Sequence, residues 1–162
     1  MPNKTLFEVP HRNRYFEDYT VGTAYEFGVE EVTEQEIISF AERYDPQFIH
    51  VDPVAAANGP FGGLIASGWL TAGLTMRLFI GNFYNERAGL GGAGIEELRF
   101  LEPVRPGDML SLRCTVQSKR VSRSKPDRGV LTFFLETLRQ DMTVVATMTT
   151  TSIMLLRGSG PC

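Results

Sequence analysis

The stretch "SGWLTAGLTMRLFIGNFY", residues 67–84, decides the fold of this chain. It is long and apolar, and Arg77 is its single charged residue. A helix without a polar face must be covered by other elements nearly all round. We therefore predict a buried central helix over residues 67–82. Its large side chains are expected to fill the core: Trp69, Leu70, Leu74, Leu78 and Phe79.

The segments on either side of this helix have the patterns of strands. Residues 24–32 alternate imperfectly between polar and apolar side chains and suit a first strand. Four further strands are indicated after Gly92, at 94–104, 108–121, 129–140 and 143–157. A run of strands after helices is typical of an α+β domain rather than of alternating βαβ units. We expect an antiparallel sheet that curves around the buried helix.

Two shorter helices are predicted between the first strand and the buried helix. Thr33 and Glu36 form a Thr-x-x-Glu capping box for the first, and Pro46 ends it. Asp52 caps the second, the Ala-rich "PVAAAN" at 53–58. The segment between them is expected to be a non-helical loop.

Length and composition limit the classes of protein to be considered. The 162 residues suffice for a single domain over 1–162, with an N-terminal arm at 1–14 and a flexible tail at 158–162. A net charge of −3 gives no electrostatic reason to expect nucleic acid as a partner. No uncharged apolar run is long enough to span a membrane.

The N-terminus and the cysteines indicate the compartment and the cofactors to be expected. The first residues lack the apolar core of a signal peptide. Cys114 and Cys162 form no metal-ligand pattern. We expect a reducing, cytoplasmic setting and no metal or redox cofactor.

Candidate chemistry lies in "RYDPQFIHVDPVAA", residues 43–56, which holds one of the two histidines. In one interpretation Asp45 ends the first helix and bonds a turn amide, while His50 is a satisfied, partly buried side chain. In the other, the carboxylate and the imidazole are directed at the same small molecule. Such a pair can hold a water molecule, remove its proton and return a proton to a neighbouring carbon.

A second candidate is Ser67-Gly68 at the start of the buried helix. The first amides of a helix have no intrahelical partner and carry partial positive charge. A glycine lets a carbonyl oxygen approach the amide of Gly68, which would stabilise an enolate-type oxyanion. The alternative is that Gly68 only relieves crowding between the helix and the sheet.

Three segments together carry a family resemblance: "FAERYDPQFIHVDPVAA" (40–56), "FGGLIASGW" (61–69) and "LRFLEPVRPGDML" (98–110). They resemble the MaoC-like dehydratases, relatives of the (R)-specific enoyl-CoA hydratases, and the resemblance runs from about Tyr15 to about Leu156. It implies the hot-dog fold, in which a curved antiparallel β-sheet is wrapped around a long central α-helix. It also implies an acyl-CoA or acyl-carrier thioester as substrate, and a homo-oligomer that is at least a dimer.

The resemblance also assigns roles to residues. Asp45 and His50 match the acid–base pair that holds the water, one taking its proton while the other protonates the α-carbon. Gly68 matches the residue whose amide binds the thioester carbonyl. Around them the implied substrate-binding residues are Ser67, Gln47, Phe48, Gly63 and Trp69. Gln47 and Phe48 depart from the Asn-Pro of the hydratases, and Ser67 stands where a histidine is frequent.

The loop "SKRVSRSKPDRG", residues 118–129, is rich in basic residues. One interpretation is a solvated hairpin tip. The other is contact between Arg120 and Arg123 and the phosphates of coenzyme A, for which arginine is well suited.

Two other functions stay open beside hydration. A thioesterase on the same fold would direct water at the thioester carbonyl, but the central helix carries no acidic residue for this. A non-catalytic subunit that binds acyl thioesters would keep the fold without turnover. The retained Asp45 and His50 argue against it, whereas Gln47 and Phe48 keep it open.

Overall fold

The computed structural model describes residues 7–159. The first six residues of the predicted arm and residues 160–162 of the predicted tail, with Cys162, lie outside the described residues. The division of the chain into arm, domain and tail stays a prediction.

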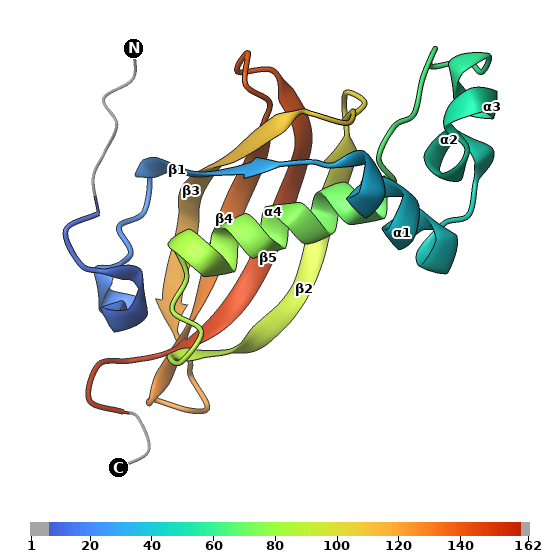
Figure 1. The fold of residues 1–162 in the computed structure, drawn as a ribbon. Coiled ribbons are helices and arrows are strands. Elements are labelled where there is room, and N and C mark those ends of the chain that lie inside the picture. The colour runs from blue at the N-terminus through green and yellow to red at the C-terminus, as the bar shows by residue number, and fades with distance from the viewer. Residues whose placement is uncertain (1–6, 160–162) are drawn as a thin grey trace.

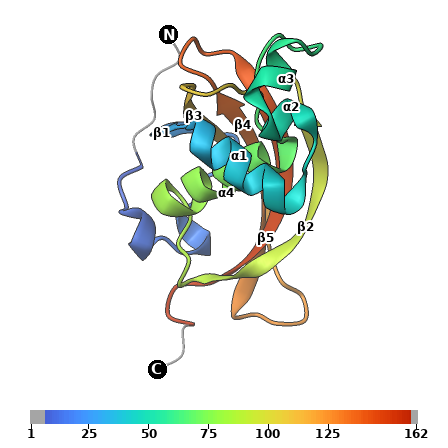
Figure 2. The same ribbon diagram turned by 45° about the vertical axis from the view of Figure 1, so that its right-hand side comes forward.

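One antiparallel sheet forms the framework of the described chain. Its five strands have the order β1-β3-β4-β5-β2. Their bounds are β1 (Ala24–Glu31), β2 (Gly89–Phe100), β3 (Met109–Val121), β4 (Arg128–Leu138) and β5 (Val144–Leu155). The sheet curves around helix α4 (Gly68–Asn82), as Figures 1 and 2 show. The predicted α+β class and hot-dog arrangement are confirmed.

The face of α4 that meets the sheet forms the core with the inward-facing side of the strands. Leu74 is 2% exposed and Phe79 is fully buried. The Phe79 ring lies 5.1 Å from that of Phe133 on β4, in an edge-to-face arrangement. Side chains alternate along a strand, so every second residue of the central strands points toward α4. Leu70, Leu74, Leu78 and Phe79 are all buried, and the core prediction is confirmed for these four residues.

The predicted burial of α4 nearly all round is wrong along one stripe. Trp69, Gly73, Arg77 and Gly81 are exposed, and Trp69 is 62% exposed. These residues follow one another at intervals of four, so they share one side of the helix. The sheet covers only the opposite side, which is why Trp69 does not fill the core.

Three helices connect β1 to α4: α1 (Glu34–Tyr44), α2 (Phe48–Val51) and α3 (Pro53–Ala57). Thr33 caps α1, since its hydroxyl accepts a hydrogen bond from the Glu36 amide. Asp52 caps α3 by accepting from the amides of Val54 and Ala55. Both predicted caps are confirmed. The second half of the predicted capping box is not formed, because the carboxylate of Glu36 pairs with Arg77 of α4 instead of the backbone of Thr33.

The prediction of a non-helical loop around His50 is wrong, because His50 lies in α2. Pro46 ends α1, but it restricts only the residue before it. A new turn begins after Gln47, whose carbonyl accepts from the amide of His50 at 2.9 Å.

The edge strand β2 begins at Gly89, five residues before the predicted strand. Most of β2 is exposed, and only β5 pairs with it.

The chain before β1 contributes two short 3-10 helices, η1 (His11–Asn13) and η2 (Phe16–Asp18). Arg14 between them is buried and donates a hydrogen bond to the carbonyl of Phe83. Within residues 7–159, every helix is too short or too polar to cross a membrane.

Candidate active site

The structure brings Asp45 and His50 together. Asp45 follows the last residue of α1, and His50 is the third residue of α2. Oδ2 of Asp45 lies 3.4 Å from Nε2 of His50. The His50 side chain is 6% exposed and the Asp45 side chain 21%. The pair is thus largely enclosed, with the carboxylate retaining some access to solvent.

The hydrogen bonds of His50 determine which of its ring nitrogens can exchange a proton. Nδ1 lies 2.7 Å from the carbonyl oxygen of Ile65. A carbonyl oxygen can only accept, so Nδ1 carries a hydrogen in this arrangement. In the neutral imidazole Nε2 is then the unprotonated nitrogen, and it is the one that faces Asp45.

Asp45 is held as a carboxylate by two donors. The hydroxyl of Ser67 donates to Oδ2 at 2.6 Å, and the amide of the Gln47 side chain donates to Oδ1 at 2.7 Å. Hydrogen bonds to the charged form favour it. The pKa of Asp45 is therefore lowered, first by the Ser67 hydroxyl, then by Gln47, with a smaller contribution from His50.

Gly68 is the first residue of α4, where the amide has no intrahelical partner. The ring of Phe100 packs directly against it: a Cβ at position 68 would lie 2.4 Å from Cε2 of Phe100. Any residue other than glycine at position 68 would displace the Phe100 ring. Both interpretations of Gly68, relief of crowding and binding of a carbonyl, remain compatible with this contact.

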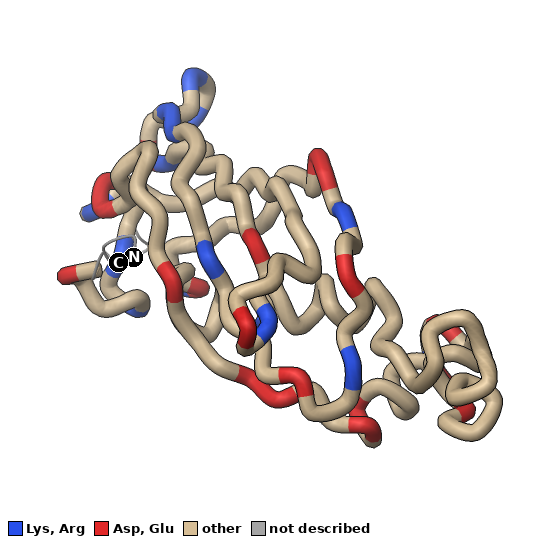
Figure 3. The backbone as a smooth tube through the Cα atoms, turned by 90° about the horizontal axis from the view of Figure 1, so that it is seen from above, with Lys and Arg blue, Asp and Glu red and all other residues tan. Residues whose placement is uncertain are grey.

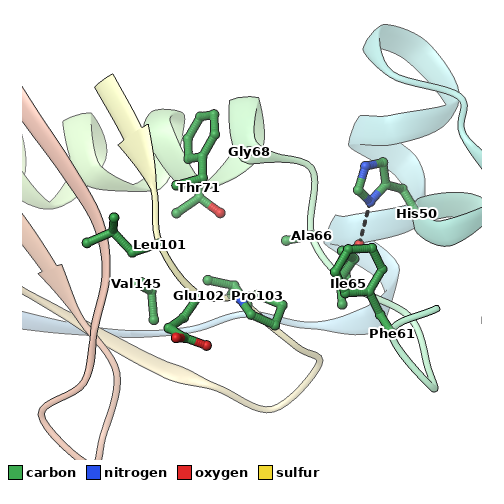
Figure 4. A pocket seen from close by; sticks show the side chains of 12 residues that line it. His50, Phe61, Ile65, Ala66, Gly68, Thr71, Leu101, Glu102, Pro103 and Val145 are labelled. Atoms are coloured by element: carbon green, nitrogen blue, oxygen red, sulfur yellow. Dashed lines mark hydrogen bonds between the residues drawn. The ribbon is translucent and has the colours of Figure 1, made fainter. Parts of the chain in front are cut away.

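A cavity of about 260 Å³ lies between α2, the start of α4 and the end of β2. His50 and Gly68 line it, as does Thr71 one turn further along α4. Figure 4 shows His50 bonded to Ile65 on one side of the cavity and Leu101 and Val145 on the other. Its walls are mainly apolar, which suits an acyl chain.

Sequence reasoning missed most of this wall. Besides the residues already considered, the cavity is lined by Phe61, Ile65, Ala66, Phe100, Leu101, Glu102, Pro103, Val104 and Val145. They come from the glycine-rich turn before α4, from the end of β2 with the segment after it, and from β5. No local motif connects these segments, so only the folded sheet could reveal their proximity.

The other predicted substrate-binding residues lie around the cavity without forming its wall. Gln47 and Ser67 bond Asp45, and Phe48 is half exposed on α2. Gly63 adopts a φ of +158° in the turn before α4, near the guanidinium of Arg105. Trp69 is exposed and meets Phe100 edge to face, with ring centroids 6.5 Å apart.

The basic loop lies far from the cavity within one chain. Arg120 is near the end of β3 and Arg123 follows it. The cavity residue Val145 lies level with the start of β3, so Arg120 is separated from it by most of β3, roughly 30 Å of strand. Figure 3 shows the basic cluster on the other side of the molecule from α2 and α3. The contact with coenzyme A phosphates stays a prediction.

Across residues 7–159, no cluster of three or more His, Cys, Asp or Glu side chains is placed to hold a metal ion.

Comparisons with known proteins identify the family. The family model described as MaoC like domain matches residues 17–132. The uncharacterized protein YdeM of Bacillus subtilis is 33% identical over 125 residues, 76% of this chain and 86% of that protein. The crystal structure of the MaoC-like dehydratase from Rhodospirillum rubrum has a TM-score of 0.83 and 39% identity, covering 90% of this chain and 99% of that one. The chain belongs to the MaoC-like domain family.

A relative with a named activity is matched over a shorter length. The 3-hydroxyacyl-thioester dehydratase Z of Mycobacterium tuberculosis is 40% identical over 78 residues, which is 47% of this chain. The matched part spans about half the length of that dehydratase, 52%.

Proposed function

We propose that this protein is an acyl-thioester hydratase or dehydratase. It adds water reversibly to a trans-2-enoyl thioester and so gives a 3-hydroxyacyl thioester. One observation carries the proposal: Nε2 of His50 and Oδ2 of Asp45 lie 3.4 Å apart, beside an apolar cavity that Gly68 also lines. Membership of the MaoC-like family and the similarity to a protein named as a 3-hydroxyacyl-thioester dehydratase support it.

The geometry supports distinct roles for the two residues. A water molecule in the cavity that bonds both side chains can give a proton to Nε2 of His50 while its oxygen adds to the β-carbon. The same imidazole then delivers a proton to the α-carbon, so that H and OH have been added and His50 is neutral again. Asp45 remains ionised and orients the water by accepting its second hydrogen. Dehydration is the reverse of these steps.

Gly68 supplies the third part of this mechanism. Addition at the β-carbon places negative charge on the thioester oxygen. The amide at the N-terminus of α4 is a donor without an intrahelical partner, at the positive end of the helix dipole. An oxygen placed against it is stabilised as its charge increases.

The test is loss of the enoyl-thioester absorbance when purified protein is mixed with crotonyl-CoA and with longer and branched enoyl-CoAs. Asp45→Asn and His50→Ala are each expected to lower turnover by about a hundredfold or more. His11→Ala, which removes the other histidine, is the matched control and should keep full activity. Undiminished turnover in His50→Ala would contradict the proposed roles. Binding without turnover on the whole panel would favour a non-catalytic subunit.

The thioesterase alternative is separated by the product. Hydrolysis releases a free thiol from acyl-CoA, whereas hydration leaves the thioester intact. The assay uses the Cys162→Ser variant, because Cys114 is fully buried and the thiol reagent then reports only released coenzyme A. Thiol release at the rate of enoyl loss would support the thioesterase.

We also propose that the protein is at least a dimer. The edge strand β2 is exposed along most of its length and carries the exposed apolar residues Leu90, Ile95 and Phe100. An exposed strand edge offers backbone groups for pairing with another chain. Light scattering during gel filtration should give a mass of twice that of the chain, or a multiple of the dimer mass. A monomer at micromolar concentration would contradict the proposal.

A further inference from the structure

We infer that Ser67 is a positioning residue, which holds the carboxylate of Asp45 against the N-terminus of α4. Gln47 assists it from the opposite side of the carboxylate. The inference deepens the proposed function and rests on it. It assigns Ser67 a role different from the substrate contact expected from the sequence.

The hydroxyl of Ser67 has a fixed direction. Ser67 is fully buried, and its Oγ accepts a hydrogen bond from the amide of Trp69 at 3.2 Å. A backbone amide can only donate, so the single hydrogen of the hydroxyl is free to be donated elsewhere. It is donated to Oδ2 of Asp45 at 2.6 Å. One side chain therefore caps α4 and bonds the candidate catalytic carboxylate.

The carboxylate is bound at both oxygens, but the two donors differ in their surroundings. Ser67 bonds Oδ2, the oxygen that faces His50. Gln47 bonds Oδ1 at 2.7 Å and is exposed to solvent. Water competes less for a buried hydrogen bond than for an exposed one. Ser67 is thus the stronger constraint on the plane of the carboxylate, and Gln47 the weaker.

The bond joins two segments that the sequence separates by 22 residues. Asp45 belongs to the end of α1, whereas Ser67 immediately precedes Gly68 on α4. Ser67 bonds the acid, and the next residue, Gly68, carries the candidate oxyanion amide. The two groups are consequently fixed relative to each other. Without the hydroxyl, the carboxylate can rotate away from His50, and both the orientation of the water and its distance from the thioester carbon change.

The experiment compares Ser67→Ala with Thr33→Ala. Each variant removes the hydroxyl that caps a helix, but Thr33 caps α1 and does not contact Asp45. We expect Ser67→Ala to lower kcat about ten- to hundredfold with little change in KM, the loss of one charge-assisted hydrogen bond. Gln47→Ala should have a smaller effect. Thr33→Ala should keep kcat.

A second measurement does not depend on turnover. The pKa of Asp45 is followed by the ¹³C shift of its labelled carboxyl group, assigned by its absence in Asp45→Asn. His50, from α2, is the ionisable group that faces this carboxylate, so the titration is repeated in His50→Ala. The pKa of Asp45 should rise in Ser67→Ala in both backgrounds, because the donor that most lowers it has been removed. It should stay unchanged in Thr33→Ala.

The two measurements distinguish failure of the inference from failure of the proposed function. An unchanged pKa of Asp45 in Ser67→Ala overturns the positioning role, whether or not the protein turns over a thioester. An active wild type whose kcat survives Ser67→Ala also overturns it. If the wild type turns over no thioester while the pKa of Asp45 rises, the proposed function fails and the positioning of the carboxylate is supported.

Discussion

Replacement of Gly68 by alanine tests the start of α4 as a binding site for a carbonyl oxygen. A Cβ at position 68 would lie 2.4, 2.6 and 2.7 Å from three carbons of the Phe100 ring. Carbon atoms in contact normally lie about 3.5–4.0 Å apart, so the ring must move by about 1 Å. Phe100 lies at the end of an edge strand and is 48% exposed within one chain, so this chain leaves its ring room to shift. We expect the free energy of unfolding to fall by about 1 kcal/mol, the lower end of the cost of overpacking.

The expected loss of activity is much larger than this loss of stability. Gly68 and Phe100 both line the cavity, so the added methyl group and the displaced ring narrow it beside the amide. A thioester carbonyl can then no longer reach the donor. Loss of one oxyanion donor lowers turnover by about 10²–10³-fold, and we expect kcat/KM of Gly68→Ala to fall within that range.

The assay pairs urea denaturation with the enoyl-CoA absorbance assay, and α4 itself supplies the control. Gly73 lies on the exposed side of the same helix, and a Cβ there meets no atom within 4 Å. Gly73→Ala should therefore retain full activity and gain up to about 1 kcal/mol from better helix propensity. Full activity in Gly68→Ala would refute the carbonyl site and leave Gly68 only its packing role.

Three further predictions concern the core, the buried thiol and the response to pH. Phe79→Ala should lower the free energy of unfolding by about 3–5 kcal/mol in urea, because this fully buried ring leaves a cavity; a loss below about 1 kcal/mol would show that α4 is not enclosed. Burial raises the pKa of the Cys114 thiol. In the Cys162→Ser variant a thiol reagent should therefore react with Cys114 only after unfolding. Rapid reaction of the native variant would contradict the burial of Cys114. The lowered pKa of Asp45 means that folding favours its ionised form. This stabilisation is complete above about pH 5 and is lost as the pH falls through the folded pKa, so the difference in unfolding free energy between wild type and Asp45→Asn should decrease on acidification; a constant difference would contradict the shift.

The elements that could be predicted from the sequence are those whose causes are local. The long apolar run at residues 67–82 predicts a helix that packs in the core, and α4 occupies Gly68–Asn82 of it. The caps Thr33 and Asp52 depend on side chains two or three residues from the amides they bond. Their identification needs no knowledge of the rest of the fold.

The wrong predictions came from local sequence rules applied to features that depend on the rest of the fold. Pro46 ends α1, but its effect stops at the residue before it, so α2 begins two residues later and contains His50. Trp69 is apolar, yet its exposure depends on which side of α4 the sheet covers, and that is a property of the sheet. The cavity wall combines residues as distant as Phe61 and Val145, which no periodicity within one segment connects.

The start of α4 shows why the candidate site lies at this particular point of the fold. A buried helix needs a cap for its first amides, since an unpaired amide away from water is costly. Ser67 meets that need with its lone pairs and keeps a hydrogen for Asp45. At the next residue, Gly68, the close approach of Phe100 leaves no room for a side chain, and it is the amide of this residue that we propose as the donor to a carbonyl oxygen. The same hydroxyl that completes the fold thus also places the carboxylate, so a change at Ser67 should affect stability and chemistry together, whereas a change at Thr33 should affect stability alone.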